Sequence, residues 1–140
     1  MKRVAVAASL VLAACGGDDP SSAASSAFPD SALTTVASES GALSIEIRTA
    51  PEQPPERGVV DVEYRITDGT GQAKSGLDVA VEAWMPDMGH GASTQPTVAA
   101  TDDGTYVASK VNFFMPGRWE LHTTLGSTPA DHATVTFQIP

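Results

Sequence analysis

The sequence predicts an all-β domain, a sandwich of two antiparallel sheets, over roughly the last hundred of its 140 residues. Apolar and polar residues alternate there with a period of two in about seven short segments, which is typical of strands with one buried face. Turn-forming Gly, Pro and Asp residues separate these segments, and no stretch of the domain has a convincing helical period.

Three predicted strands lie in the first half of this domain. Pro51, Pro54 and Pro55 end the first of them, because proline cannot donate a hydrogen bond to a ladder. Asp68 and Gly69 form the turn after the second. The inward-facing residues of the three strands are Leu43, Ile45 and Ile47, then Val60, Val62, Tyr64 and Ile66, then Leu77, Val79, Val81 and Ala83.

Four more predicted strands follow a long loop rich in Pro, Gly and Met. Asp102, Asp103 and Gly104 indicate a hairpin between the first two of them. The inward-facing residues of the four strands are Val98 and Ala100, then Tyr106, Ala108, Val111 and Phe113, then Trp119, Leu121 and Thr123, then Ala133, Val135, Phe137 and Ile139. Seven short strands in about a hundred residues predict an immunoglobulin-like antiparallel β-sandwich, with a small closed barrel as the structural alternative.

Residues 1–14 have the pattern of an export signal. A basic start precedes the apolar run Val4–Leu12, which is too short for a permanent transmembrane span. The run leads through small residues into Cys15, and this ending resembles the lipobox of bacterial lipoproteins. The resemblance implies that the lipoprotein signal peptide 1–14 is removed and that Cys15 is lipidated, which anchors the protein to a membrane. An ordinary secretory signal with an incidental cysteine is the alternative.

The lipid anchor also sets the expected compartment, which is the cell envelope on its periplasmic or extracellular face. Gly16 stands directly after the cysteine, where an inner-membrane retention signal would place Asp, so the outer membrane is favoured in a host with two membranes. Cys15 is the single cysteine of the chain. Once it is lipidated, the domain has no thiol for a disulfide, a nucleophile or a metal ligand.

A flexible linker is predicted between the lipid and the domain. Residues 15–40 begin with the lipidated cysteine and continue as a Ser/Ala-rich stretch without an apolar period, which buries too little surface to offset its chain entropy. The folded domain is then expected over residues 41–140.

The chain is strongly acidic. Its formal net charge is −9, and removal of residues 1–14, which contain Lys2 and Arg3, takes it to −11. A protein of this charge does not bind nucleic acid through counterion release. An anionic membrane surface would also repel it, so the expected membrane attachment depends on the lipid.

No catalytic constellation is recognisable, and we expect the protein not to be an enzyme. The segment Gly69–Ser75 has a weak likeness to a phosphate-binding loop, but it lacks the glycine before its lysine and no helix follows it. There is no Gly-x-Ser-x-Gly nucleophile motif, and the Asp and Glu residues lie mostly at outward strand positions.

Every methionine of the predicted domain lies in one of two short segments. Met85, Met88 and His90 belong to the loop after the third strand, and Met115 precedes the sixth strand. In an immunoglobulin-like sandwich these two strands are antiparallel neighbours, so the four side chains should share one rim of the domain. Thioether and imidazole donors suit Cu(I), which makes these four residues a candidate copper site. Asp87 would add an oxygen ligand if the ion were Cu(II).

Packing is the competing explanation of the same residues. Met85 continues the inward parity of its strand, and Met115 can fill a gap beside an aromatic ring. His90 lies between two glycines and is the residue that packing explains least. His122 is expected to be a solvated histidine paired with Glu82 on the neighbouring strand, because the register shifted by two would set two glutamates against each other.

The segment Met85–Gly91, which reads MPDMGHG, together with Gly104–Tyr106 and Phe114–Leu121, which reads FMPGRWEL, resembles the YtkA-like domain family, to which the FixH family is related. The likeness covers roughly residues 43–139. It implies an exported β-sandwich, often attached to a membrane, with the candidate site on the methionines and histidine named above. FixH-type proteins are linked to copper delivery and to haem-copper oxidase assembly, but this chain has a predicted lipid anchor in place of their transmembrane helix.

Two functions are therefore expected as alternatives. The first is a lipid-anchored protein that holds, buffers or passes copper in the cell envelope. The second is a metal-free interaction or assembly module, in which Trp84, Met88 and Phe114 contact another envelope protein.

Overall fold

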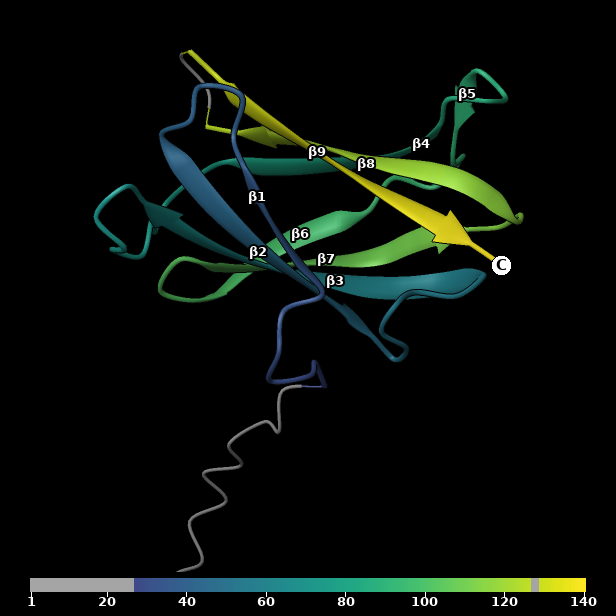
Figure 1. The fold of residues 1–140 in the computed structure, drawn as a ribbon, viewed down its shortest axis with the longest axis horizontal. Helices are drawn as coiled ribbons and strands as arrows, with labels where there is room; N and C mark the ends of the chain where they lie inside the picture. Colours follow the sequence, from purple (N-terminus) through teal and green to yellow (C-terminus); the bar gives the residue numbers. More distant parts are fainter. Residues whose placement is uncertain (1–26, 127–128) are drawn as a thin grey trace, which may run out of the picture.

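Two antiparallel sheets face each other in the computed structural model, which describes residues 27–126 and 129–140 (Figure 1). The predicted signal peptide, Cys15 and the first part of the predicted linker lie outside the described residues. Within the described residues no helix is long and apolar enough to cross a membrane. The strands of this part are β1 (Thr34–Ala37), β2 (Leu43–Ala50), β3 (Gly58–Asp68), β4 (Val79–Met85), β5 (His90–Gly91), β6 (Thr97–Asp102), β7 (Thr105–Phe113), β8 (Gly117–Leu125) and β9 (Asp131–Ile139).

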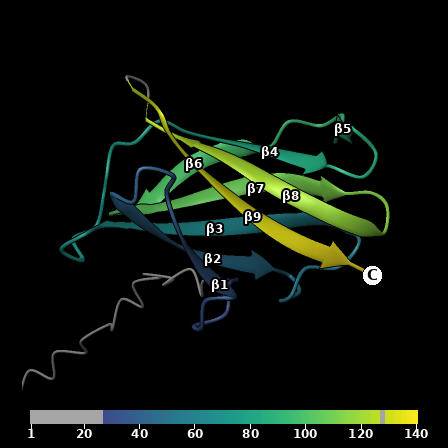
Figure 2. The same cartoon turned by 45° about the horizontal axis from the view of Figure 1, so that its top comes forward.

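The strand order is that of an immunoglobulin-like sandwich. One sheet has the order β1-β2-β3-β7-β6, and the other has the order β5-β4-β8-β9 (Figure 2). Strands β2, β3, β7 and β6 take the places of the A, B, E and D strands of that fold, and β4, β8 and β9 take those of C, F and G. The predicted all-β sandwich is confirmed, and its seven strands are joined by two more, β1 and β5.

The register between β4 and β8 is also the predicted one. Glu82 lies opposite His122, and Trp84 lies opposite Glu120. This pairing keeps the two glutamates from facing each other, which is the reason for preferring it on sequence grounds. It brings the end of β4 beside the start of β8 and so positions the candidate site.

The core fills the space between the sheets with the inward-facing residues of the predicted alternation. In β4 every second residue is buried. Phe113 packs edge-to-face on Trp119 and on Phe137, with ring centroids 5.5 and 6.0 Å apart. Between the sheets, the Thr123 hydroxyl donates to the Tyr64 hydroxyl across 3.3 Å, and burial raises the pKa of Tyr64.

Strand β1 lies inside the predicted linker, so the prediction of a flexible coil through residue 40 is wrong for Thr34–Ala37. This strand pairs with β2 along its whole length. Beyond it, Ser40 donates from its backbone N–H (3.1 Å) and from its hydroxyl (2.5 Å) to the carboxylate of Asp131 at the start of β9. Backbone pairing with β2 and the hydrogen bonds to Asp131 order this segment. Because Val36 is its one sizeable apolar residue, the segment has no apolar alternation from which a strand could be predicted.

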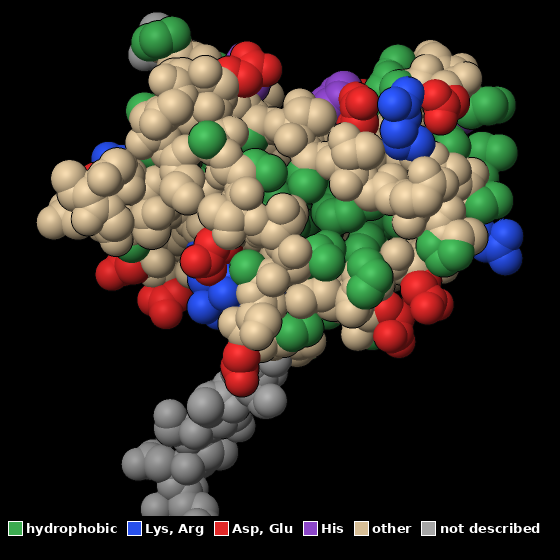
Figure 3. All heavy atoms as spheres, in the orientation of Figure 1, with side chains coloured by type: hydrophobic (Ala, Val, Ile, Leu, Met, Phe, Trp, Pro, Cys, Tyr) green, Lys and Arg blue, Asp and Glu red, His purple; other side chains and the backbone are tan. Residues whose placement is uncertain are grey.

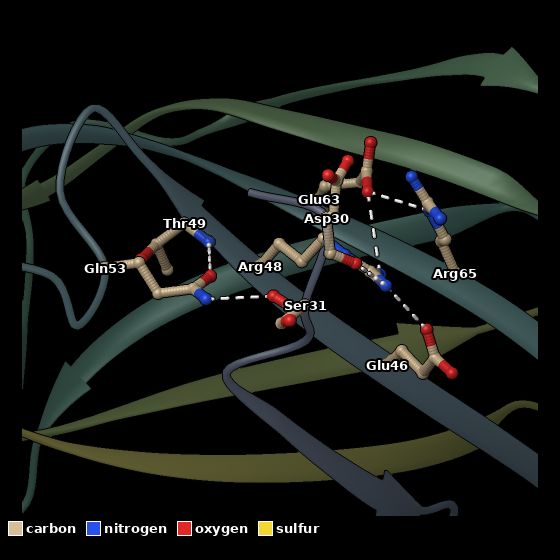
Figure 4. Close-up of polar contacts among 8 residues, drawn as sticks. All are labelled: Asp30, Ser31, Glu46, Arg48, Thr49, Gln53, Glu63 and Arg65. Carbon is tan, nitrogen blue, oxygen red and sulfur yellow. Dashed lines mark hydrogen bonds and ion pairs between the residues drawn. The ribbon is translucent and has the colours of Figure 1, made fainter. Parts of the chain in front are cut away.

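Residues Asp30 and Ser31 are also held against β2, on the face of the strand that points away from the core (Figure 4). The Arg48 guanidinium donates to the Asp30 carbonyl oxygen at 3.1 Å, and the Gln53 amide donates to the Ser31 carbonyl oxygen at 2.9 Å. Arg48 is buried, and it lies 3.7 Å from the carboxylate of buried Glu63, which compensates its charge. The contacts of the domain therefore extend well before residue 41.

Candidate functional site

The loop after β4 and the loop after β7 lie at the same end of the sandwich (Figures 1 and 2). We call residues 85–91 and 114–118 the rim. The Arg118 guanidinium and the Asp87 carboxylate join the two segments in an ion pair of 2.8 Å, and the His90 ring stacks on the Phe114 ring at 6.1 Å. The predicted adjacency of the two segments is therefore present in the structure.

The tight turn between β4 and β5 makes Met88 project from the fold. The backbone N–H groups of Met88 and Gly89 both donate to the Met85 carbonyl oxygen, at 3.2 and 2.9 Å. Gly89 has a φ of 69°, a left-handed conformation that glycine adopts without strain. Met88 at this turn is 56% exposed.

His90 begins the return strand directly opposite Met85. Its side chain is exposed, and its Nδ1 lies 3.3 Å from the Gly91 carbonyl oxygen. The stack on Phe114 is nearly parallel, with 15° between the ring planes, and Phe114 in turn meets Trp119 edge-to-face at 5.3 Å. One ring face of the imidazole is thus supported by the neighbouring segment.

The other two predicted ligands lie deeper in the domain. Met85 is 3% exposed and belongs to the hydrophobic core. The φ of Gly117 is 133°, which favours glycine, and a Cβ atom there would approach the Met85 methyl to 3.0 Å. Met115 is half-buried against the core, and its carbonyl oxygen accepts a hydrogen bond from the Trp119 indole at 2.9 Å.

The four predicted residues thus form a graded set. Met88 and His90 are exposed, Met115 is half-buried and Met85 is buried. Their segments meet, as predicted, but Met85 takes the packing role that its inward parity also indicates.

Two features of the rim were not recognised in the sequence. One is the His90–Phe114 stack, which depends on the exact conformation of two loops. The other is the Asp87–Arg118 ion pair, for which a signal existed, since opposite charges flank two strand ends predicted to be neighbours. Because of this pair, the Asp87 carboxylate already has a cationic partner.

His122 lies away from the rim, on the outer face of β8. Its register partner is Glu82, as predicted, but the polar partner differs from the prediction. The His122 Nε2 lies 2.9 Å from the carboxylate of Glu120 on its own strand, and its ring stacks on Trp84 at 6.4 Å. Glu120 reaches His122 because residues two apart on one strand share a face.

Away from the rim, two of the histidines lie near each other. His122 and His132 line a shallow pocket of about 280 Å³ with Glu39. Among the residues described by the structure, however, no three His, Cys, Asp or Glu side chains come together in a way that could hold a metal ion.

An immunoglobulin-like β-sandwich with methionine and histidine on one rim is the class of protein that this fold and site define. A family model described as YtkA-like matches residues 38–124, which is more than half of the chain and includes both rim segments. The chain belongs to the YtkA-like family. No curated protein and no solved structure matches it.

Proposed function

We propose that this protein is an exported, lipid-anchored member of the YtkA-like family that binds Cu(I) at the rim and holds or passes the ion without catalysis. The observation that carries the proposal is that the loop with exposed Met88 and His90 meets the segment of half-buried Met115, through the Asp87–Arg118 ion pair and the His90–Phe114 stack. Two thioethers and one imidazole are the donors on which the proposal depends.

The chemistry of this donor set supports copper in its reduced state. Thioether sulfur is a soft ligand that suits Cu(I), and imidazole accompanies it readily. Asp87, the carboxylate of the rim, is paired with Arg118, so the harder oxygen donor is engaged elsewhere. Met85 belongs to the core and supports the site by packing, not as a metal ligand. A site at the exposed end of the domain suits transfer of the ion to a partner protein.

The proposed location rests on the N-terminal residues. Cleavage before Cys15 and lipidation of its thiol and amine would place the protein in the cell envelope, on a membrane facing the periplasm or on the extracellular face. Metabolic labelling with a radioactive fatty acid tests this step. We expect label on the wild-type chain and none on a Cys15→Ser variant, and equal labelling of both would reject the anchor.

Copper binding is tested on the chain from Gly16 to Pro140 by titration with Cu(I) against a competing chelator. We expect a dissociation constant tighter than micromolar. Met88→Leu, Met115→Leu and His90→Ala should each weaken binding by at least about ten-fold, which is what loss of even an outer-shell partner of a metal costs. Met85→Leu is the matched control, because it removes a buried sulfur with little change of volume. Absence of tight binding by the wild-type chain would reject the proposal.

A second function is favoured by a separate observation, the exposure of apolar side chains at the same end. In the described residues, the exposed large hydrophobic side chains are Val59, Met88 and Phe114, and two of these three, Met88 and Phe114, belong to the rim. Figure 3 shows hydrophobic side chains along the right-hand edge of the molecule, where Figure 1 places β5. Such a patch is typical of a protein-interaction surface.

The two functions differ in their dependence on metal. In the interaction module, Phe114→Ser would abolish cross-linking to an envelope partner equally with and without a Cu(I) chelator. In the copper protein, the chelator itself would change cross-linking to the wild-type chain.

A further inference from the structure

We propose that Met88 is a site of reversible oxidation, at which oxidants of the peroxide class convert the thioether to a sulfoxide ahead of the other methionines of the domain. The three methionines differ sharply in their access to solvent. Met88 is 56% exposed, Met115 is half-buried and Met85 is 3% exposed. Susceptibility of methionine to oxidation follows exposure, so the expected order is Met88, then Met115, then Met85.

The local fold keeps Met88 in this position. Its backbone N–H and that of Gly89 are both held by the Met85 carbonyl oxygen, which closes the turn beneath the Met88 side chain. The side chain lies outside the hydrophobic core, in contrast to Met85 and to the packed edge that includes Met115. Conversion of Met88 to a polar side chain therefore leaves the fold intact, whereas oxidation of Met85 would disrupt the core.

The chemical step is a two-electron oxygen transfer. A lone pair of the Met88 sulfur attacks one oxygen of hydrogen peroxide, a sulfur–oxygen bond forms, and the oxygen–oxygen bond breaks. The second oxygen leaves as water after it takes up the proton of the transferred one. Sulfur is oxidised and the peroxide is reduced. Methionine sulfoxide reductases, with a thiol reductant, reverse the change.

The consequence for the metal site rests on the proposed function. A sulfoxide lacks the soft thioether donor that suits Cu(I), so oxidation of Met88 removes one of three donors. We infer that an oxidised rim releases Cu(I), and that reduction of the sulfoxide restores binding.

The first test needs no metal. The purified full chain is treated with graded hydrogen peroxide, and the oxidation of each methionine is followed by peptide mass spectrometry. The ratio of the exposed fractions of Met88 and Met85 is about 19, from 56% and 3%, so we expect Met88 to react at least about ten-fold faster. Circular dichroism should be unchanged when Met88 alone is oxidised. Oxidation of Met85 or Met115 as fast as Met88, with the fold intact, would overturn the proposal.

The second test addresses the metal. After selective oxidation, the affinity for Cu(I) should fall at least about ten-fold, and treatment with sulfoxide reductases should restore it. Ag(I), a soft ion that peroxide does not oxidise, in contrast to Cu(I), should slow the oxidation of Met88. Met88→Leu is the control, since its residual affinity should not respond to peroxide. Unchanged affinity of the oxidised wild-type chain would overturn the release of Cu(I).

The two tests distinguish failure of the proposed copper function from failure of the proposed oxidation site. If the untreated wild-type chain binds no Cu(I) while Met88 still oxidises first, the copper function fails and the oxidation site stands. If Cu(I) binds tightly but the order of oxidation is different, the oxidation site fails and the copper function stands.

Discussion

The two ends of the sandwich are built in different ways. At the far end, opposite the rim, the turns are closed by polar contacts: the Tyr106 hydroxyl donates to the Lys74 carbonyl oxygen at 2.7 Å and accepts from the Leu77 N–H at 3.0 Å. Asp131 clamps Ser40 at the same end. The rim instead exposes a thioether, an imidazole and a phenyl ring, and one exposed ion pair joins its two segments.

The far end therefore contributes mainly to the stability of the fold, whereas the rim has the groups that can bind a ligand. Hydrogen bonds satisfy polar groups in the described turns of the far end, among them the Tyr106 hydroxyl, the Leu77 N–H and the Ser40 hydroxyl. Exposed soft and aromatic groups add little to the stability of the fold, because they are not removed from water. Their presence at one end is the physical basis for placing function there, and the following predictions test the contrast.

The largest expected effect concerns Trp119, the buried side chain on which Phe114 of the rim packs. Trp119 is fully buried, packs on Phe113 and donates to the Met115 carbonyl oxygen. Trp119→Ala should lower the free energy of unfolding by about 3–5 kcal/mol through loss of core contacts. Urea denaturation measures it, and Phe114→Ala, which trims an exposed ring, is the control.

If Trp119→Ala does not fold, Trp119→Phe tests the same role, because it keeps a ring and removes the hydrogen bond to Met115. If Phe114→Ala lowered the free energy of unfolding as much as Trp119→Ala does, the distinction between buried Trp119 and the exposed rim would be contradicted.

The next effect comes from Gly117. Its φ of 133° strains any residue with a side chain, and a Cβ atom there would also come within 3.0 Å of the Met85 methyl, which would have to shift slightly. Gly117→Ala should cost about 1–3 kcal/mol of unfolding free energy, in the range of a residue forced into a disfavoured backbone conformation. Gly69→Ala at the far end is the matched control, since nothing lies within 4 Å of its Cβ position. Equal stability of the two variants would show that the close contact at Gly117 relaxes freely.

A smaller, pH-dependent effect is expected at the far end. Hydrogen bonds from Ser38 and Ser40 hold the pKa of Asp131 well below its usual range. Because the folded state has the lower pKa, this contribution is present above the unfolded value, about 3.9, and is lost as the pH falls below it. The difference in Tm between wild type and Asp131→Asn should be largest near neutral pH and should shrink in acid. Asp78→Asn, also on the exposed surface, is the control, and a constant difference across pH would contradict the clamp.

The smallest effect is expected for the ion pair of the rim. Asp87 and Arg118 are both well exposed, so solvent screens their attraction. Asp87→Ala should change the free energy of unfolding by less than about 1 kcal/mol. Chemical denaturation in low and high salt measures it. A larger loss would mean that the rim is as tightly built as the far end.

Most of the fold could be predicted because alternation and turn residues report directly on strands with one buried face. The register of β4 and β8 followed from a single electrostatic argument about Glu82. Strand β1 was missed because its order comes from backbone pairing with β2 and from the Asp131 clamp, and neither leaves a pattern in residues 34–37. Strand β5 is two residues long, too short to have a period.

The candidate site could be predicted in position but not in detail. Neighbouring strands brought Met88, His90 and Met115 to one end, as the fold class requires. The burial of Met85 could be predicted from its inward position in the alternation of its strand. The stack of His90 on Phe114 could not be predicted, because it depends on loop conformations that local sequence does not determine.

The attachment of Asp30 and Ser31 to β2 has a mechanical consequence for a lipid-anchored protein. Arg48 and Gln53 hold the chain at Asp30 and Ser31, so the segment from the proposed anchor at Cys15 to the Arg48 contact is 15 residues long, shorter than the 25 residues from Cys15 to Ser40. A fully extended segment of 15 residues spans about 50 Å. If Cys15 carries the lipid that we propose, that length would limit how far the rim can reach from the membrane anchor, and loss of the Arg48 contact would extend that reach.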